Sequence, residues 1–119
     1  MSKKPTFACQ FEFTPDNRAV VIALLGKLDP EAVEELHPQV QEVYRAGVRR
    51  FVFDLTHLEY AGSLGLRLLV GLANQVRGEG AIAVYRPTEA VLSMLTMTKL
   101  TQLLPVHLTR EEALAAVHK

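Results

Sequence analysis

Ser63 is the residue of this sequence whose surroundings best suit chemistry. A dense apolar stretch that begins at Phe51 predicts a strand covered on both faces, as in a parallel or mixed sheet packed by helices. A second apolar pattern, from Leu64 to Val76, predicts a largely buried helix. The Ser63 hydroxyl would therefore lie at the carboxyl end of a strand and cap the amino end of a helix. In open α/β sheets this is the usual place for ligands and chemistry.

A nucleophilic serine is one chemistry that this position allows. Residues 61–65, with the sequence AGSLG, differ from the Gly-x-Ser-x-Gly nucleophile elbow of hydrolases only at the first position. In that fold an aspartate or glutamate and then a histidine follow the serine, and no aspartate follows Asp54 here. Pairing a later glutamate with His107 would be forced. The sequence therefore predicts a protein that is not an enzyme.

Metal and cofactor chemistry also lack support in the sequence. The histidines at 37, 107 and 118 show no ligand spacing, so we expect no metal site. The single cysteine, Cys9, excludes an intrachain disulfide and Cys-based zinc patterns. No glycine-rich loop ends in Lys-Ser or Lys-Thr, so a phosphate-cradling loop is absent from the sequence. We expect no cofactor.

Composition narrows the partners and the location. Thirteen Lys and Arg residues balance thirteen Asp and Glu residues, without a long basic run, which argues against nucleic acid as a partner. No apolar run reaches the roughly 18 residues of a membrane span, and the first residues do not resemble a signal peptide. We expect residues 1–119 to form one domain in the cytoplasm, with no direct membrane insertion.

The elements that position Ser63 are predicted in the order β-β-α-β-α-β-α-β-α, which favours one α/β layer structure. The strands are expected at residues 7–13, 19–25, 48–55, 81–85 and 103–108. The first helix starts at Asp29 and Pro30 and ends at Gly47, with a kink or interruption at Pro38. The others are expected at 63–77, after Pro87 and Thr88, and after a capping box at Thr109.

At this point the sequence resembles a STAS domain, the module shared by anti-sigma factor antagonists and the cytoplasmic tails of sulfate transporters. The strand FVFDLTHLEYA followed by GSLGLRLL is similar to the family's apolar strand and its Asp-Ser-Ser-Gly-Leu motif. The tail MLTMTKLTQLLPVHLTREEAL resembles the family's Leu-x-x-x-x-Leu-x-x-x-apolar-Pro segment and closing Glu-Glu-Ala-Leu. The resemblance covers nearly the whole chain. It implies a STAS-like α/β fold, a mixed sheet of about five strands with about four packed helices.

The resemblance also implies a function and a switch. The family's phosphorylatable serine falls on Ser63 and its following glycine on Gly65. In the antagonist branch the anti-sigma factor is a kinase that phosphorylates this serine, while the unmodified form binds the anti-sigma factor and so frees the sigma factor. The expected partner is therefore an anti-sigma factor serine kinase, with a serine phosphatase as a second candidate.

Two departures from the family pattern keep an alternative open. The family's aspartate before the serine is Gly62 here, and its next small polar residue is Leu64. The glycine usual before the second leucine of the tail is Lys99. The departures at Gly62 and Leu64 favour a purely structural STAS subunit, without phosphorylation, in a lipid-transport ABC complex or a stress-signalling assembly.

The predicted partner-binding surface surrounds Ser63. It comprises His57, Glu59, Tyr60, Gly62, Ser63, Leu64 and Gly65. Several of these residues also have structural interpretations: Ser63 as a helix cap only, His57 in a surface loop, and Tyr60 in the core. The two glycines would let the backbone turn sharply and the first helical turn pack closely. We expect Asp54 to accept backbone N–H bonds at a strand end, rather than to bind a metal or act as a base.

Overall fold

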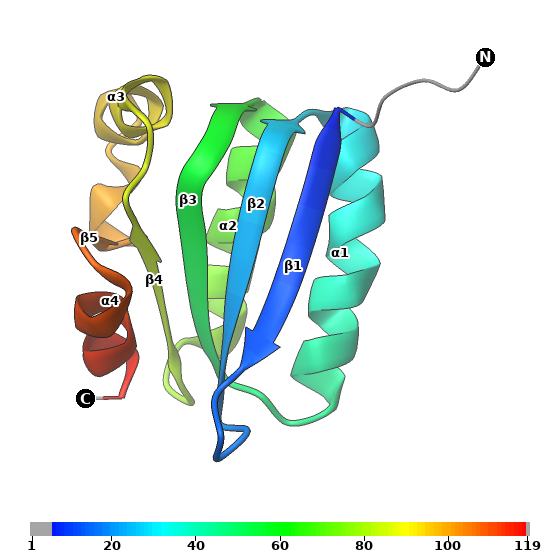
Figure 1. Ribbon diagram of the computed structural model, residues 1–119, viewed down its shortest axis with the longest axis vertical. Coiled ribbons are helices and arrows are strands. Elements are labelled where there is room, and N and C mark those ends of the chain that lie inside the picture. Colours follow the sequence, from blue (N-terminus) through cyan, green and yellow to red (C-terminus); the bar gives the residue numbers. More distant parts are fainter. Residues whose placement is uncertain (1–5, 119) are drawn as a thin grey trace.

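The computed structural model describes residues 6–118. Within them, the alternating and the continuous apolar runs form a five-stranded mixed sheet (Figure 1). The strands are β1 (Phe7–Phe13), β2 (Ala19–Leu28), β3 (Arg50–Ala61), β4 (Ala81–Tyr85) and β5 (Val106–His107). Their spatial order follows the chain, β1-β2-β3-β4-β5. β1 and β2 form an antiparallel hairpin, and the remaining neighbours pair in parallel. The predicted mixed sheet is therefore confirmed.

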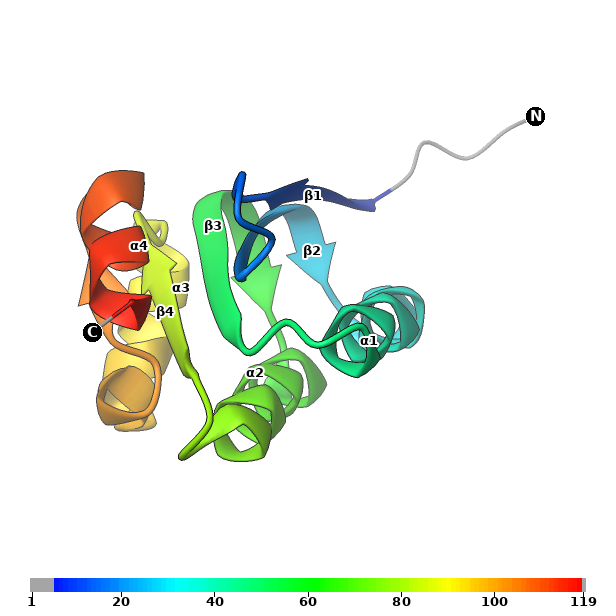
Figure 2. The same ribbon diagram turned by 90° about the horizontal axis from the view of Figure 1, so that it is seen from below.

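In the described part of the chain, four α-helices pack on this sheet. They are α1 (Pro30–Arg45), α2 (Ser63–Val76), α3 (Glu89–Met97) and α4 (Arg110–Val117), with a short 3-10 helix, η1 (Leu100–Gln102), after α3. α1 and α2 lie side by side on one face, and α4 packs on the opposite face (Figure 2). No helix in the described part of the chain is long and apolar enough to cross a membrane.

The core follows from this layering. The main cluster contains the inward side chains of β2 and β3, such as Ile22 and Phe53, packed against α1, α2 and α3. A smaller cluster on the other face joins Val52 and Ala83 to Val117 of α4. β3 is thus buried on both faces, as its unbroken apolar run predicted.

Side-chain caps fix where three helices begin, at starts that the sequence predicted. The carboxylate of Asp29 accepts a hydrogen bond from the Ala32 N–H at 2.9 Å. The Thr88 hydroxyl accepts from the Val91 N–H at 3.4 Å. In the last helix the Thr109 hydroxyl accepts from the N–H three residues later, at 3.1 Å, as a capping box requires.

Several predictions about these elements are wrong. β2 does not end at Leu25 but continues to Leu28. β3 does not span residues 48–55 but runs from Arg50 to Ala61, because two β-bulges let it continue beside β2. The strand expected at 103–108 is only Val106–His107, because the N–H groups of Leu103 and Leu104 donate to the Leu100 carbonyl and so continue the turn of η1. α1 is not interrupted at Pro38, which lies on its solvent face, where water can reach the carbonyl that a proline leaves unpaired.

Gly65 decides how closely α2 approaches the end of β2. A methyl group added at Gly65 would lie 2.8 Å from side-chain carbons of Leu28 and 3.0 Å from the Leu28 carbonyl oxygen. The Leu28 side chain is fully buried, so it has little room to move. The predicted close packing at Gly65 is confirmed.

Two glycine-to-alanine changes in α2 should therefore have opposite effects on stability. Gly65→Ala should lower the free energy of unfolding by about 1 kcal/mol, because the overpacking of about 1–3 kcal/mol exceeds the gain of about 1 kcal/mol in helix propensity. Gly71→Ala, where an added methyl meets nothing within 4 Å, should raise it by about 0.5–1 kcal/mol. Urea unfolding of both variants is the measurement. A stabilised Gly65→Ala protein would contradict the close packing.

Candidate functional site

The carboxyl ends of β2, β3 and β4 lie at the same end of the molecule as the amino ends of α1, α2 and α3, at the top in Figure 1. Two hydrogen bonds join these segments. The Gly62 N–H donates to the Leu28 carbonyl at 3.2 Å, and the Thr88 hydroxyl donates to the Leu58 carbonyl at 2.9 Å. The start of α2 is thereby held between the start of α1 and the start of α3.

Ser63 is the first residue of α2, not its cap. The N-cap position belongs to Gly62, whose backbone is extended (φ −80°, ψ 180°), and no side chain caps this helix. Ser63 already has helical geometry, so its hydroxyl is one position too late to accept from the next N–H groups. The cap predicted for Ser63 is therefore wrong, and its exposed side chain is left for another role.

The first turn of α2 offers backbone donors to an anion. The first intrahelical bond runs from the Leu66 N–H to the Gly62 carbonyl, at 3.0 Å. The N–H groups of the three preceding residues thus have no acceptor within the helix. The first turn also contains no acidic side chain. A negative group on Ser63 would meet both the free N–H groups and the positive end of the helix dipole.

Tyr60 lies over the glycine that precedes Ser63. A Cβ atom placed on Gly62 would be 3.1 Å from the Tyr60 hydroxyl oxygen, so the phenol occupies the space beside this position. Tyr60 is 47% exposed and belongs to β3, so its core interpretation is wrong. The extended backbone of Gly62 is accessible to any residue, so the sharp turn predicted there does not require glycine.

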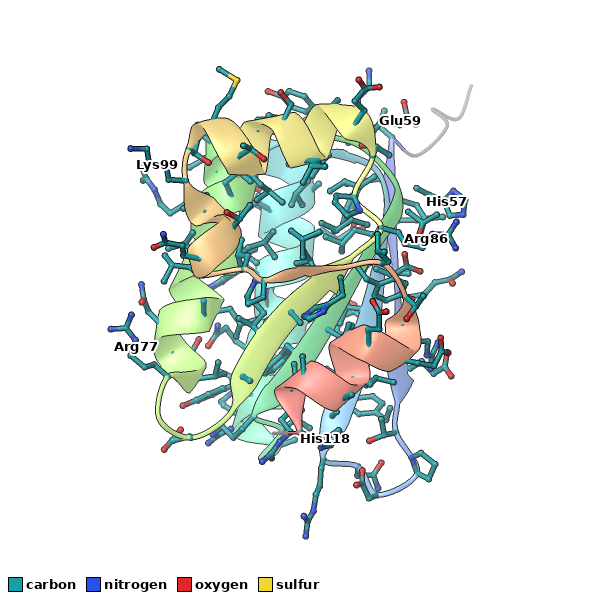
Figure 3. All side chains as sticks on the ribbon, turned by 90° about the vertical axis from the view of Figure 1, so that its left-hand side faces the viewer. His57, Glu59, Arg77, Arg86, Lys99 and His118 are labelled. Atoms are coloured by element: carbon teal, nitrogen blue, oxygen red, sulfur yellow. The ribbon has the colours of Figure 1, made fainter. Side chains whose placement is uncertain are left out.

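The two bulges of β3 explain the outward side chains before Tyr60. The pairing with β2 shifts between Asp54 and His57 and again between Leu58 and Tyr60, so β3 carries extra residues at both points. His57 and Glu59 are exposed and project outward (Figure 3). His57 therefore lies on a strand and not in the predicted surface loop. The bulge between Leu58 and Tyr60 leaves two consecutive side chains, those of Glu59 and Tyr60, exposed.

The structure brings together only part of the predicted partner-binding set. Tyr60, Gly62, Ser63 and the 42% exposed Leu64 are neighbours at the start of α2. Gly65 is buried against Leu28, so it sets the distance between elements and does not form surface. His57 lies farther back along β3, roughly 10 Å from the end of the strand. This distance follows from a rise of about 3.3 Å per strand residue, with one residue taken up by a bulge.

Asp54 has a structural role. One of its carboxylate oxygens accepts hydrogen bonds from the Thr56 N–H at 3.0 Å and from the Thr56 hydroxyl at 2.5 Å. The predicted backbone acceptor is confirmed, although Asp54 lies within β3 beside its first bulge and not at a strand end. Burial, and then the negative charge of Asp54, raise the pKa of Tyr85 to about 12. Within residues 6–118, no group of three or more His, Cys, Asp or Glu side chains could hold a metal ion.

Sequence reasoning missed a groove between α1 and α2 that starts at Leu64, beside Ser63. Polar residues interrupt the apolar faces of both helices along it, at Gln41 in α1 and at Arg67 and Gln75 in α2. Their helical spacing was the signal that could have indicated a groove. Only the tertiary structure shows that these two sides face each other.

Comparison with known proteins agrees with this architecture. The family model described as "Mlab, STAS domain" matches residues 11–105. A relative from Bordetella bronchiseptica, BtrV, is named as an anti-sigma factor antagonist. It is 29% identical over 98 residues, which make up 82% of this chain and 84% of the relative.

Solved structures show the same fold. An anti-sigma factor antagonist from Mycobacterium paratuberculosis has a TM-score of 0.86 and 23% identity, with 100% of both chains covered. The antagonist SpoIIAA in its unphosphorylated form has a TM-score of 0.78 and 25% identity, over 90% of this chain and 93% of that one. The phosphorylated form of SpoIIAA, from Bacillus, has a TM-score of 0.72 and 23% identity, over 92% of this chain and 98% of that one. With four helices on a mixed five-stranded sheet and a family model that spans most of its length, the chain belongs to the STAS domain family.

Proposed function

We propose that this protein is an anti-sigma factor antagonist that binds an anti-sigma factor serine kinase in the cytoplasm and is released when Ser63 is phosphorylated. The observation that carries the proposal is the exposed Ser63 side chain at the first position of α2, beside free backbone N–H groups and exposed apolar side chains. Two further findings support it. The relative BtrV is named as an antagonist, and SpoIIAA has been solved in both unphosphorylated and phosphorylated forms.

Phosphorylation is compatible with the folded state. A phosphate adds about −1.5 to −2 charges, which the amino end of α2 is suited to receive. The interaction with the helix dipole is favourable by roughly 0.3–1 kcal/mol at an exposed site. No acidic side chain in the first turn of α2 opposes it. We expect the fold to survive modification.

Binding of the partner, in contrast to the fold, should be weakened by phosphorylation of Ser63. Tyr60 and Leu64 expose apolar surface on either side of Ser63, so a docked protein would approach closely and exclude water there. A phosphate trapped in that contact would lose hydration, at a cost of several kcal/mol unless the partner supplies cations. The serine is then the switch, a serine phosphatase would restore binding, and the chain itself performs no catalysis.

A second candidate is a structural STAS subunit that is never phosphorylated. One observation favours it: the position before Ser63 carries no carboxylate, and the Tyr60 phenol lies beside it instead. In this role Ser63 would only be part of a permanent contact with a subunit of a lipid-transport ABC complex or a stress-signalling assembly.

Ser63 variants separate these candidates. The wild type is used as bait in the native cell, and the captured kinase is identified by mass spectrometry and purified. Ser63→Ala should bind it like the wild type, whereas Ser63→Glu should bind about two orders of magnitude more weakly, since each 1.4 kcal/mol is a factor of ten. Calorimetry measures the affinities. Gln10→Glu is the control: it adds a negative charge at an exposed position of β1 and should leave the affinity unchanged. Equal affinity for all variants would support the structural subunit.

Gly62→Asp tests what the missing carboxylate does. Aspartate at this N-cap should raise the free energy of unfolding by about 0.5–1 kcal/mol through capping and the helix dipole, after a small shift of the exposed Tyr60 side chain. If a carboxylate assists kinase recognition, the variant should also be phosphorylated faster or bound more tightly. Gly62→Asn is the matched control, because asparagine caps without a charge. A folded Gly62→Asp protein with wild-type phosphorylation rate and affinity would exclude a recognition role.

A further inference from the structure

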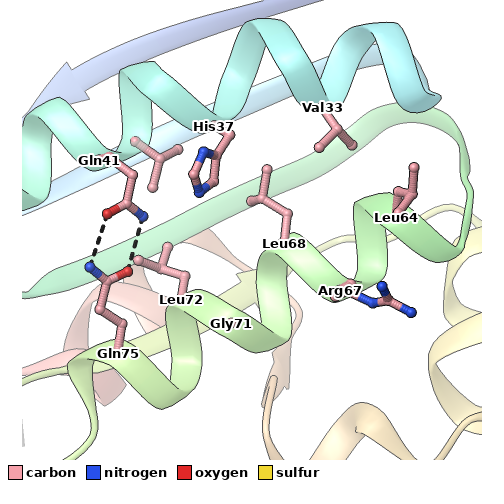
Figure 4. Close-up of a pocket in the computed structure, with 10 residues that line it drawn as sticks. Val33, His37, Gln41, Leu64, Arg67, Leu68, Gly71, Leu72 and Gln75 are labelled. Atoms are coloured by element: carbon pink, nitrogen blue, oxygen red, sulfur yellow. Dashed lines mark hydrogen bonds between the residues drawn. The ribbon is translucent and has the colours of Figure 1, made fainter.

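A groove of about 450 Å³ separates α1 from α2 along the face of these helices that points away from the sheet (Figure 4). One end lies at Val33 and Leu64, near the start of both helices. At the other end the amides of Gln41 and Gln75 bridge the two helices with reciprocal hydrogen bonds of 3.0 Å each. The groove therefore has a fixed width at one end and an open entrance beside Ser63.

The base of the groove is apolar, and it contains a notch. The partly exposed Val33 and the exposed Leu64 supply apolar surface at the entrance, and the nearly buried Val40, Leu68 and Leu72 close the base. In the middle of α2, Gly71 has no side chain, and a Cβ atom placed there would meet nothing within 4 Å. His37 of α1 points across the groove toward this part of α2. An incoming side chain can thus occupy the space that Gly71 leaves, as a knob fits a hole between helices.

The charge of the groove has one sign. Arg67 is the one charged residue among the ten that line it, and no carboxylate does. Arg67 also takes no part in the ion pairs that the structure holds within residues 6–118. A partner with a carboxylate opposite Arg67 would complete an ion pair at the rim, while its apolar side chains cover the base.

We propose that this groove binds an amphipathic helix of a protein partner, which places one large apolar side chain in the notch at Gly71 and an acidic side chain against Arg67. From Leu64 to Gln75, α2 extends for about 16 Å at 1.5 Å per residue, which matches three turns of a docked helix. The groove is open to solvent along its length, because the side chains of His37 and Arg67, which line it, are exposed. A small molecule would not be enclosed there, whereas ligand sites bury most of their ligand.

This surface is separate from the Ser63 switch, although the two share Leu64. Binding in the groove needs neither the serine hydroxyl nor a phosphate. It would add a second contact along α2 for a partner that also covers Ser63, or serve a different protein altogether. The test below therefore uses a defined peptide, and its result does not depend on the antagonist function.

The probe is a fluorescein-labelled, alanine-rich helical peptide of about 15 residues, with leucines at i, i+4 and i+7 and glutamates beside them. A second peptide carries lysines in place of the glutamates. Fluorescence anisotropy with the full chain gives the affinities, and amide NMR shifts locate the binding. We expect the glutamate peptide to shift α2 amides around Gly71, and the lysine peptide to bind several-fold more weakly.

Three variants make the test specific. Gly71→Leu fills the notch and should weaken binding about tenfold or more. Ala115→Leu, which adds a leucine at an exposed position of α4 on the other side of the sheet, should not weaken it. Arg67→Glu should lower the affinity for the glutamate peptide and raise the affinity for the lysine peptide. NMR spectra of each variant confirm folding.

Several results would overturn the proposal. They are no binding of the glutamate peptide, shifts confined to another face, or equal affinity for the wild type and a folded Gly71→Leu protein. The proposal also fails if dodecanoate or anionic phospholipid vesicles shift the same amides while the peptide does not, since the groove would then be a lipid site.

Discussion

The close contact between the start of α2 and the end of β2 is the constraint on which the rest of the site depends. Gly65 lies against Leu28 with no room for a methyl group, and the Gly62 N–H is bonded to the Leu28 carbonyl. Together these contacts fix both the position and the rotation of the first turn of α2. Because Gly65 must face Leu28, Ser63 and Leu64 must face solvent. The exposed hydroxyl thus follows from a packing requirement on a buried glycine two residues later.

The bulges of β3 build the other side of this surface. An unbroken strand would turn every second residue toward the core. Two shifts in the pairing with β2 instead leave His57, Glu59 and Tyr60 exposed, while Leu58 and Ala61 remain buried. Tyr60 can then lie over Gly62. The group beside Ser63 is therefore a neutral phenol and not a carboxylate.

α2 connects two surfaces of different character. Its first turn is an exposed helix start with backbone N–H groups suited to an anion. Its flank toward α1 is an apolar groove closed by Gln41 and Gln75, with a single cation. A partner that used both would combine a contact that phosphorylation can abolish with one that it leaves intact. Such a division would set how completely modification releases the partner, since linked contacts add to affinity beyond either alone.

The sequence alone determined the features that depend on neighbouring residues. Apolar spacing predicted the two-sided burial of β3 and the position of α2, and the caps at Asp29, Thr88 and Thr109 placed three helix starts. Features that depend on pairing between distant segments were decided only in the tertiary structure. The bulges exist because β3 must stay in register with β2, and the groove exists because Gln41 meets Gln75 across 34 residues of chain. Local preferences carry no information about strand register or about which helix sides face each other. Both are set by the surfaces that must be buried together.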